Sequence, residues 1–327
     1  MVVVTGGTGF LGAYIIRELV EKGYQVRALR RKKTFPSFIP AHIIEAVEWV
    51  DGDILDIVSL EDAFKDATSV VHAAAMVSYH RSDRDALYQT NVEGTANVMN
   101  IALEKGIKKM VHVSSIAAIG RDGNGDVVNE ERKWTSSKYI SHYSRSKHQA
   151  ELEVWRAIAE GLPAVIVNPS MILGYGDWNQ SSCAMFKSIH DEFPYYSNGI
   201  NGFVDVEDVA RATVMLMESP IHSKRFILNG ENRSFHDLFN SIADAFGKKR
   251  PYLKATPFLS QVAVRMEQFK SLFGKKLMLT KETARIANSK TYFSNASVLK
   301  ALPGFEFTPL EETIKKACSQ YSRQQAS

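Results

Sequence analysis

Short apolar runs and helical patterns alternate along the first half of the chain. Residues 2–4 are three valines that predict a buried strand, and an amphipathic helix follows the glycine-rich segment 5–9. Further strands are expected at 25–29, 47–50, 69–74, 110–114 and 164–168, and further helices at 59–66, 84–104 and 140–160. This alternation predicts an α/β fold, in which helices cover both faces of a parallel sheet and the crossovers between strands are right-handed.

The pattern loosens after about residue 170. Residues 233–290 are mostly helical in pattern, with Phe, Leu and Met three and four positions apart. We therefore expect a first domain over residues 1–170 and a smaller, mostly helical lobe. The lobe is expected at 171–202 and 231–292, and the segments 203–230 and part of 293–320 are expected to return to the first domain.

Composition narrows the class of protein. The 327 residues are 45% hydrophobic and 23% charged, which is ordinary for a soluble globular protein. The net charge of +4 is small and the basic clusters are scattered, so we expect no nucleic-acid partner. Two cysteines fit a reducing compartment, and no stretch approaches the roughly 18 apolar residues of a membrane span. We expect a cytoplasmic protein with no membrane partner.

The glycines between the first strand and the first helix predict a nucleotide-binding loop. Glycines 7, 9 and 12 satisfy G-x-G-x-x-G, and glycines 6, 9 and 12 satisfy a looser form. In such a loop the glycines allow a tight turn, a close approach to a pyrophosphate and close helix–strand packing. The alternative is an ordinary strand-to-helix turn. The residues expected to contact the nucleotide are Gly6, Gly7, Thr8, Gly9, Phe10, Leu11 and Gly12.

The ends of the second and third strands bear on the choice of nucleotide. Arg30 and Arg31 stand where NAD-binding folds carry an acid for the ribose hydroxyls. Guanidinium groups bind a 2′-phosphate, so NADP(H) is favoured over NAD(H). The alternative is a solvated basic turn. Asp53, after the third strand, is placed to accept a hydrogen bond from adenine, although an Asp beside a Gly is more often a turn former.

Tyr143 and Lys147 lie four residues apart at the start of a predicted helix, so one helix face carries both. An ammonium about 4 Å from the phenol, at an effective dielectric near 20, would favour the phenolate by roughly 4 kcal/mol, or about three pKa units. The pair then suits proton transfer near neutral pH. The alternative is a surface Tyr–Lys pair. Ser114 and Ser115 end a strand, where a hydroxyl can bind a substrate oxygen or simply cap a turn.

Together these residues resemble the extended short-chain dehydrogenase/reductase family, of the NAD-dependent epimerase/dehydratase superfamily, over nearly the whole chain. Within this family, the motifs most resemble those of the branch that contains the dihydroflavonol-4-reductases and 3β-hydroxysteroid dehydrogenases. The matching motifs are the glycine loop, Asp53, His72-Ala-Ala-Ala75, Asn91-Val-Glu-Gly-Thr95, Ser115, Tyr143-x-x-x-Lys147, Asn168-Pro-Ser170 and Val204-Asp-Val-Glu-Asp-Val-Ala210.

The resemblance implies a Rossmann-type doubly wound parallel sheet that binds NADP, with a small, mostly helical C-terminal lobe for substrate. It makes Tyr143 the acid/base, while Lys147 lowers the tyrosine pKa and holds the nicotinamide ribose. Ser115 orients the reacting oxygen, with Ser114 as a second candidate. The further cofactor-binding residues that it implies are Asp53, Ile54, Ala73, Ala74, Ala75, Asn91, Ser114, Asn168, Pro169 and Ser170.

The function expected is an NADP(H)-dependent oxidoreductase that interconverts a small-molecule carbonyl and a secondary alcohol by hydride transfer. A nucleotide-sugar 4-epimerase with tightly bound cofactor is the alternative enzyme, although residues 201–203 lack the arginine that grips a diphosphate in such members. A non-enzymatic NADP-sensing regulator is the remote alternative. The histidines show no metal-ligand spacing, so no metal is expected. The resemblance leaves a homodimer open, through the helices at 84–104 and 140–160.

Overall fold

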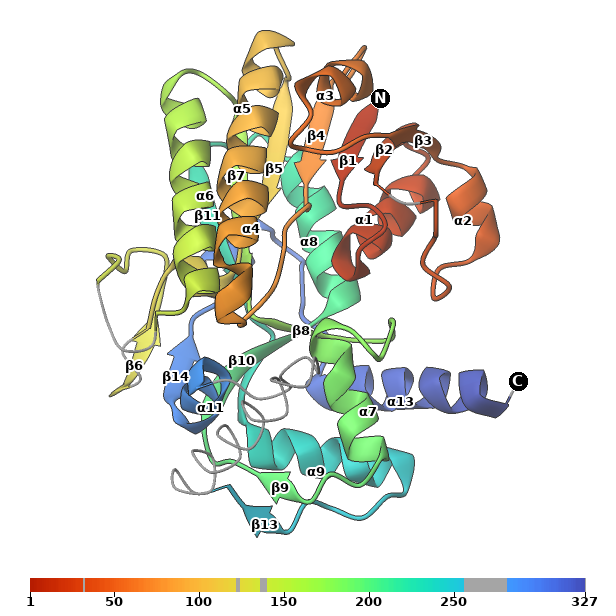
Figure 1. Ribbon diagram of the computed structural model, residues 1–327, viewed down its shortest axis with the longest axis vertical. Coiled ribbons are helices and arrows are strands. Elements are labelled where there is room, and N and C mark those ends of the chain that lie inside the picture. The colour runs from red at the N-terminus through yellow and green to blue at the C-terminus, as the bar shows by residue number, and fades with distance from the viewer. Residues whose placement is uncertain (32, 122–123, 136–139, 256–280, 327) are drawn as a thin grey trace.

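A computed structural model of the chain describes residues 1–31, 33–121, 124–135, 140–255 and 281–326 (Figure 1). In this part of the chain seven strands form one parallel sheet in the order β3-β2-β1-β4-β5-β7-β11. The order reverses direction between β1 and β4, as in a doubly wound dinucleotide-binding fold, so the predicted Rossmann-type sheet is confirmed. The strands are β1 (Val2–Thr5), β2 (Val26–Arg30), β3 (Glu48–Asp51), β4 (Ser69–His72), β5 (Lys109–Val113), β7 (Ala164–Pro169) and β11 (Lys224–Leu228).

Helices cover both faces of this sheet. One face carries α1 (Phe10–Glu21) and α8 (Val206–Glu218), which pack against each other, together with the short α2 (Ala41–Glu45). The other carries α3 (Ile57–Ala63), α5 (Gly94–Glu104) and α6 (His142–Ala159). β1 and β7 are buried along their whole length, which is why they contain runs of apolar residues, whereas the edge strand β3 begins and ends with exposed residues.

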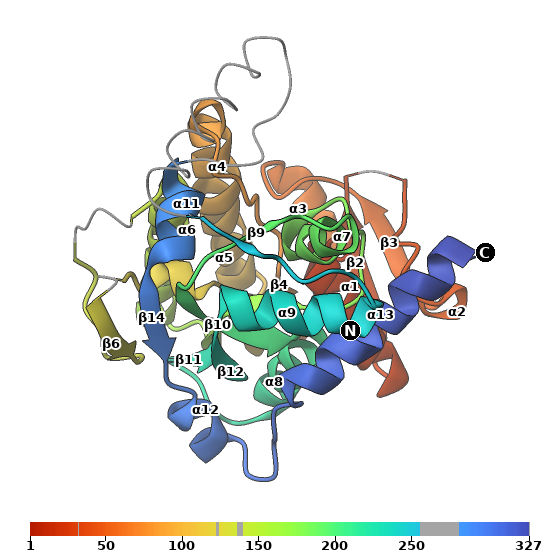
Figure 2. The same cartoon turned by 90° about the horizontal axis from the view of Figure 1, so that it is seen from below.

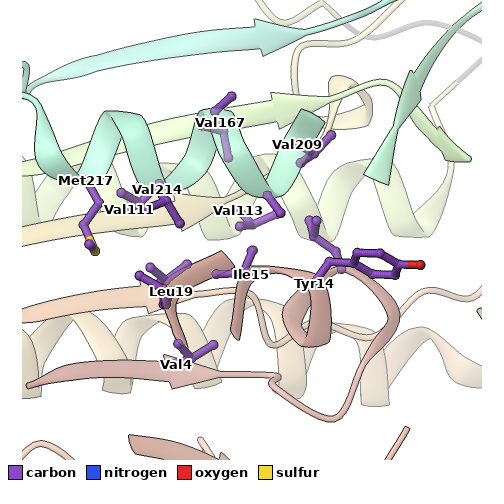
Figure 3. Close-up of a cluster of buried hydrophobic side chains, with 14 of the residues drawn as sticks. Val4, Tyr14, Ile15, Leu19, Val111, Val113, Val167, Val209, Val214 and Met217 are labelled. Atoms are coloured by element: carbon purple, nitrogen blue, oxygen red, sulfur yellow. The ribbon is translucent and has the colours of Figure 1, made fainter. Parts of the chain in front are cut away.

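Alternate residues of each strand enter different cores. Val2 and Val4 of β1 pack in the cluster beneath α1 and α8, and Val3 packs in the cluster beneath α3, α5 and α6. Figure 3 shows the first of these clusters, where Val4 of the sheet meets α1 and α8. The fully buried residues labelled there include Ile15, Leu19, Val111, Val167, Val209 and Val214.

A second, smaller sheet lies at the carboxyl edge of the first (Figure 1). Its order is β12-β10-β14-β6, and β8 pairs with β10; a separate pair joins β9 and β13. The sequence pattern did not predict this sheet. Its strands are β6 (Asn124–Val128), β8 (Met171–Leu173), β10 (Ile200–Asp205), β12 (Glu231–Ser234) and β14 (Lys290–Phe293), and the separate pair is β9 (Tyr195–Tyr196) and β13 (Leu253–Lys254).

The C-terminal part of the chain adds three helices around a third apolar cluster (Figure 2). These are α7 (Ala184–His190), α9 (Phe235–Phe246) and α13 (Leu310–Ala326). The helical interpretation of residues 233–290 is correct at α9 and at α11 (Lys281–Asn288), while residues 256–280 lie outside the described residues. The short helix α12 (Ala296–Ala301) packs beside β11. The predicted division into two domains stays a prediction.

The helix expected at 84–104 is interrupted. After a 3-10 turn (Arg81–Asp83), α4 (Arg84–Tyr88) runs into a single π-helical turn, η2 (Gln89–Glu93), and α5 continues from it. Two more 3-10 turns are η3 (Ile116–Ala118) and η4 (Ser181–Cys183). No helix among the described residues is both long and apolar enough to cross a membrane.

Candidate active site

The glycine loop that joins β1 to α1 is tightly packed. Gly6 has a positive φ of +75°, and its carbonyl oxygen accepts a hydrogen bond of 2.9 Å from Gly9 N–H. A Cβ on Gly12 would lie 2.1 Å from that same carbonyl oxygen, so only glycine fits there. The first turn of α1 carries no acid and no side chain caps it. Its free N–H groups therefore suit an anionic group such as a pyrophosphate.

The two arginines at the end of β2 differ in what they contact. Arg30 Nε lies 2.6 Å from Asp51 Oδ1, and its guanidinium stacks over the Phe35 ring. This hydrogen bond lowers the pKa of the Asp51 carboxyl. Arg31 is 66% exposed in its side chain, and its nearest acid, Asp53, is 3.7 Å away. Arg30 is thus held by Asp51, and Arg31 is the more available cation.

Three polar side chains of α6 are buried on one face of the helix. Ser141 caps the helix by accepting from Ser144 N–H at 2.9 Å. Tyr143, Lys147 and Glu151 follow at intervals of four residues, with 9%, 2% and 2% of their surface exposed. This face meets the carboxyl end of β5, where Lys147 Nζ donates to the carbonyl oxygen of Val113 at 3.0 Å.

Burial changes the titration of both members of the Tyr–Lys pair. It raises the pKa of Tyr143; the nearby Tyr79 adds to this effect, and the hydrogen bond with Ser115 opposes it. It lowers the pKa of Lys147 to about 8, against the raising effect of Glu151. The expectation that Lys147 depresses the phenol pKa is therefore wrong for this structure. The reason is that desolvation outweighs other effects, and the ammonium is bound by a backbone carbonyl.

The two adjacent serines have separate partners. Ser115 Oγ accepts from Ala117 N–H at 3.1 Å as the cap of η3, and Ala117 packs against Tyr143. Ser114 Oγ donates to Glu151 Oε2 at 2.8 Å. The structure therefore brings Ser115 to the phenol, while the hydroxyl of Ser114 is engaged with α6.

Several of the other predicted cofactor-binding residues lie near the glycine loop or α6. A Cβ on Gly6 would lie 2.6 Å from the backbone nitrogen of Ala74, so the loop and residues 73–75 are in close contact. Asn91, in the π-helical turn, exchanges hydrogen bonds with the backbone of Met76 and donates to Ser146 Oγ at 2.9 Å. Ile54 is buried beneath Gly94. Contact of these residues with a dinucleotide stays a prediction.

Asn168, Pro169 and Ser170 lie at the end of β7, beside the end of β5. Asn168 Nδ2 donates to the carbonyl oxygen of Ser115 at 3.0 Å and to Glu151 Oε2 at 2.8 Å. The other side-chain atom of Asn168, Oδ1, is buried without a protein partner among the described residues, and so is Ser170 Oγ. Asn168 thus holds the backbone of Ser115, the predicted catalytic serine.

Comparison with known proteins agrees with this geometry. The family model described as "NAD dependent epimerase/dehydratase family" matches residues 2–228. The chain belongs to this family. The predicted resemblance to extended short-chain dehydrogenases/reductases is thereby confirmed, and members of this family bind a nicotinamide dinucleotide.

Individual relatives of the family are similar over most of their length. A protein of Synechocystis sp. named "Putative dihydroflavonol 4-reductase" is 35% identical over 254 residues, which cover 76% of this chain and 73% of the relative. "Sterol demethylase protein B" of Methylococcus capsulatus is 33% identical over 262 residues, covering 79% and 78%. The crystal structure of gox2253 superimposes with a TM-score of 0.82 and 30% identity, covering 99% of this chain and 98% of that one.

Sequence reasoning missed two features of this family member's site. Glu151 was not singled out, although it continues the four-residue spacing of Tyr143 and Lys147. His72 is held between Thr5 Oγ1 at 2.6 Å and Thr95 Oγ1 at 3.0 Å. Burial and the charge of Lys147 lower its pKa to about 3, so it is a neutral support under the site.

An open hollow of about 600 Å³ lies elsewhere, along β12 and α9. It is lined by none of the predicted catalytic residues, and its cation Arg233 pairs with Glu231 and Glu311. We therefore take the junction of β1, β5, β7 and α6 as the candidate active site. Among the described residues no group of three or more His, Cys, Asp or Glu could hold a metal ion.

Proposed function

We propose that this chain is an NADP(H)-dependent oxidoreductase that interconverts a carbonyl and a secondary alcohol. The observation that carries the proposal is the burial of Tyr143 and Lys147 one turn apart on α6. Tyr143 packs against Ala117, whose N–H donates to Ser115 Oγ, so the phenol lies beside Ser115. This group lies at the carboxyl edge of the sheet, where open α/β folds build their sites.

The residues present fit the dinucleotide of the family. The glycine loop offers free N–H groups and a cradle that a Cβ would fill, and Asp53, Ile54 and residues 73–75 border the same edge. The bound dinucleotide would supply the hydride donor or acceptor.

Each catalytic side chain then has one role. The Tyr143 hydroxyl gives a proton to the substrate oxygen or takes it back, and the Ser115 hydroxyl holds that oxygen in place. With its pKa raised by burial, Tyr143 keeps its proton at neutral pH, which suits the direction of carbonyl reduction. Lys147, with a pKa of about 8, is mostly an ammonium at pH 7 and can hold the nicotinamide ribose.

The preference for NADP(H) is assigned to Arg31. Because Arg30 is held by Asp51, the more exposed Arg31 is the cation that can turn toward a 2′-phosphate. The Arg30–Asp51 pair also neutralises the acid that would otherwise repel that phosphate.

The cellular setting forms part of the proposal. Both cysteines, Cys183 and Cys318, are free and buried, which fits a reducing cytoplasm. The substrate is a small molecule bound between the Rossmann-type domain and the C-terminal lobe. A homodimer through α5 and α6 is the assembly that the family resemblance suggests.

Two alternatives are separated by one assay. A 4-epimerase returns its hydride to the same substrate, and a regulator turns over nothing, so neither consumes NADPH in the steady state. Residues 201–203 within β10 are Asn, Gly and Phe, all buried, and they offer no cation to a sugar diphosphate.

The test is a panel of ketones, aldehydes and sugar nucleotides, screened for steady consumption of NADPH by absorbance. We expect turnover with at least one ketone or aldehyde and none with sugar nucleotides. The variant Tyr143→Phe, which we expect to lose turnover, is the matched control. Conversion of a sugar nucleotide without net NADPH consumption would replace this proposal by the epimerase.

A further inference from the structure

The buried carboxylate of Glu151, near the candidate active site, accepts hydrogen bonds from four donors. Oε2 accepts hydrogen bonds from Ser114 Oγ and Asn168 Nδ2, both at 2.8 Å. Oε1 accepts from Arg225 Nη1 at 3.0 Å and from Trp155 Nε1 at 3.4 Å. Only 2% of the side chain is exposed. A carboxylate removed from water is stable only when donors replace its hydration, and here four donors do so.

These donors come from different parts of the sheet. Ser114 follows β5, Asn168 belongs to β7 and Arg225 to β11, so one carboxylate of α6 joins the ends of two neighbouring strands to a residue of the third. Arg225 also donates to the backbone carbonyls of Glu130 and Arg132. The carboxylate is therefore the centre of a network and not a single ion pair.

The network reaches Ser115 from two sides. Ser114, its neighbour in the chain, is bound directly to Glu151. Asn168 donates to Glu151 and to the carbonyl oxygen of Ser115 through the same amide nitrogen. The backbone around the Ser115 hydroxyl is thus held by Glu151. A small displacement of a catalytic group lowers the reaction rate strongly.

The same carboxylate lies one helical turn from Lys147. The titratable groups that interact with the ammonium are His72 of β4, His112 of β5 and Glu151 of α6. Both histidines are buried, and burial together with Lys147 lowers their pKa, so they stay neutral. Glu151 is therefore the one acid among these described groups that opposes the desolvation of Lys147.

We propose that Glu151 is a positioning residue of this site: it fixes Ser115 through Ser114 and Asn168, and it places a negative charge one helical turn from the Lys147 ammonium. The effect of Ser115 positioning on turnover rests on the proposed function, whereas the effect of Glu151 on Lys147 protonation does not. Glu151 acts through these neighbours and needs no contact with substrate.

The first experiment follows the protonation of Lys147 by NMR in protein labelled at the lysine side chains. The Lys147 signal is identified by its loss in Lys147→Met. We expect a midpoint near pH 8 in the unchanged protein. In Glu151→Gln, which keeps the shape and removes the charge, the midpoint should fall by about one pH unit or more. An unchanged midpoint in the folded Gln variant would overturn the charge role.

Glu153→Gln is the matched control. Glu153 lies on the same helix, but it is partly exposed and pairs with Arg156 at 2.9 Å. Removal of this charge should leave the Lys147 midpoint unchanged. An equal fall in both variants would show a general effect of helix charge and contradict the proposal.

Ser114→Ala tests the positioning of Ser115 and leaves the Glu151 carboxylate in place. It also tests the positioning role if Glu151→Gln does not fold. Its Lys147 midpoint should stay near pH 8, while kcat with NADPH and the best carbonyl of the panel should fall several-fold, because Ser115 loses one anchor. A normal kcat would overturn the positioning role. If the enzyme consumes NADPH with no carbonyl compound of the panel, the proposed function fails. The lysine titration still decides the charge role of Glu151.

Discussion

Replacement of Arg31 by Ala should weaken NADPH binding and leave NADH binding nearly unchanged. A charge-assisted contact to a phosphate contributes about 1.5–3 kcal/mol. Because the Arg31 side chain is 66% exposed, water screens the contact, and we expect the lower end of that range. The dissociation constant for NADPH should therefore rise about tenfold.

The measurement is a fluorescence titration of both dinucleotides at one fixed salt concentration. The control is Lys33→Ala, which removes a charge from the same exposed turn and should change NADPH binding less than about twofold. An equal loss for NADH and NADPH, or no loss in Arg31→Ala, would refute the assignment of NADP preference to Arg31.

Three further predictions concern the catalytic group and the substrate. Tyr143→Phe should lower turnover by roughly 10²–10⁴-fold with NADPH binding retained in the same titration; near-normal turnover would refute the mechanism. Lys147 has a folded pKa of about 8 and an ordinary value of 10.5, so between these pH values the unfolded chain binds more protons and stability rises with pH. In Lys147→Met, denaturant unfolding should lack this rise, which is at most about 3 kcal/mol; an equal rise in the variant would contradict burial of the ammonium. UDP-sugars should show no micromolar binding by calorimetry, because residues 201–203 offer no counter-charge for a diphosphate; such binding would favour the epimerase.

Most strands of the main sheet were predictable because helices cover both faces of the sheet. β1, β2, β3, β5 and β7 each lie within one or two residues of the expected positions. The pattern is plainest in β1 and β7, which are buried along their whole length and contain runs of apolar residues. The second sheet was not predictable in this way. Its strands have three to six residues, and β10 pairs with segments as distant in the chain as β8 and β14. Local patterns hold no information on such pairing.

The helix at 84–104 shows a different limit. Its apolar periodicity predicts one continuous helix, but the π-helical turn at Gln89–Glu93 inserts one wide turn that leaves the pattern almost unchanged. That turn contains Asn91, whose side chain ties the Met76 backbone to α6. The sequence motif singled out Asn91, but it gave no sign of the π-helical turn that presents this side chain.

On α6 the spacing of residues predicted which side chains share a face, but not how deeply they are buried. Of two neighbouring residues on this helix, the apolar Leu152 is 52% exposed and the charged Glu151 is 2% exposed. The expected depression of the Tyr143 pKa failed for the same reason, because a distance along a helix carries no estimate of desolvation. Burial decides the sign, and burial depends on the strands that α6 faces.

The polar face of α6 explains how one helix serves both fold and chemistry. Toward its C-terminal end Val154 and Ala157 enter the apolar cluster beneath the sheet. Toward its N-terminal end Tyr143, Lys147 and Glu151 are buried against the carboxyl ends of β5 and β7, where backbone carbonyls and side-chain amides can satisfy them. A helix laid along a parallel strand therefore passes from the apolar middle of the sheet to its polar edge. Buried titratable groups are tolerable only at that edge, and that is also where a substrate can reach them.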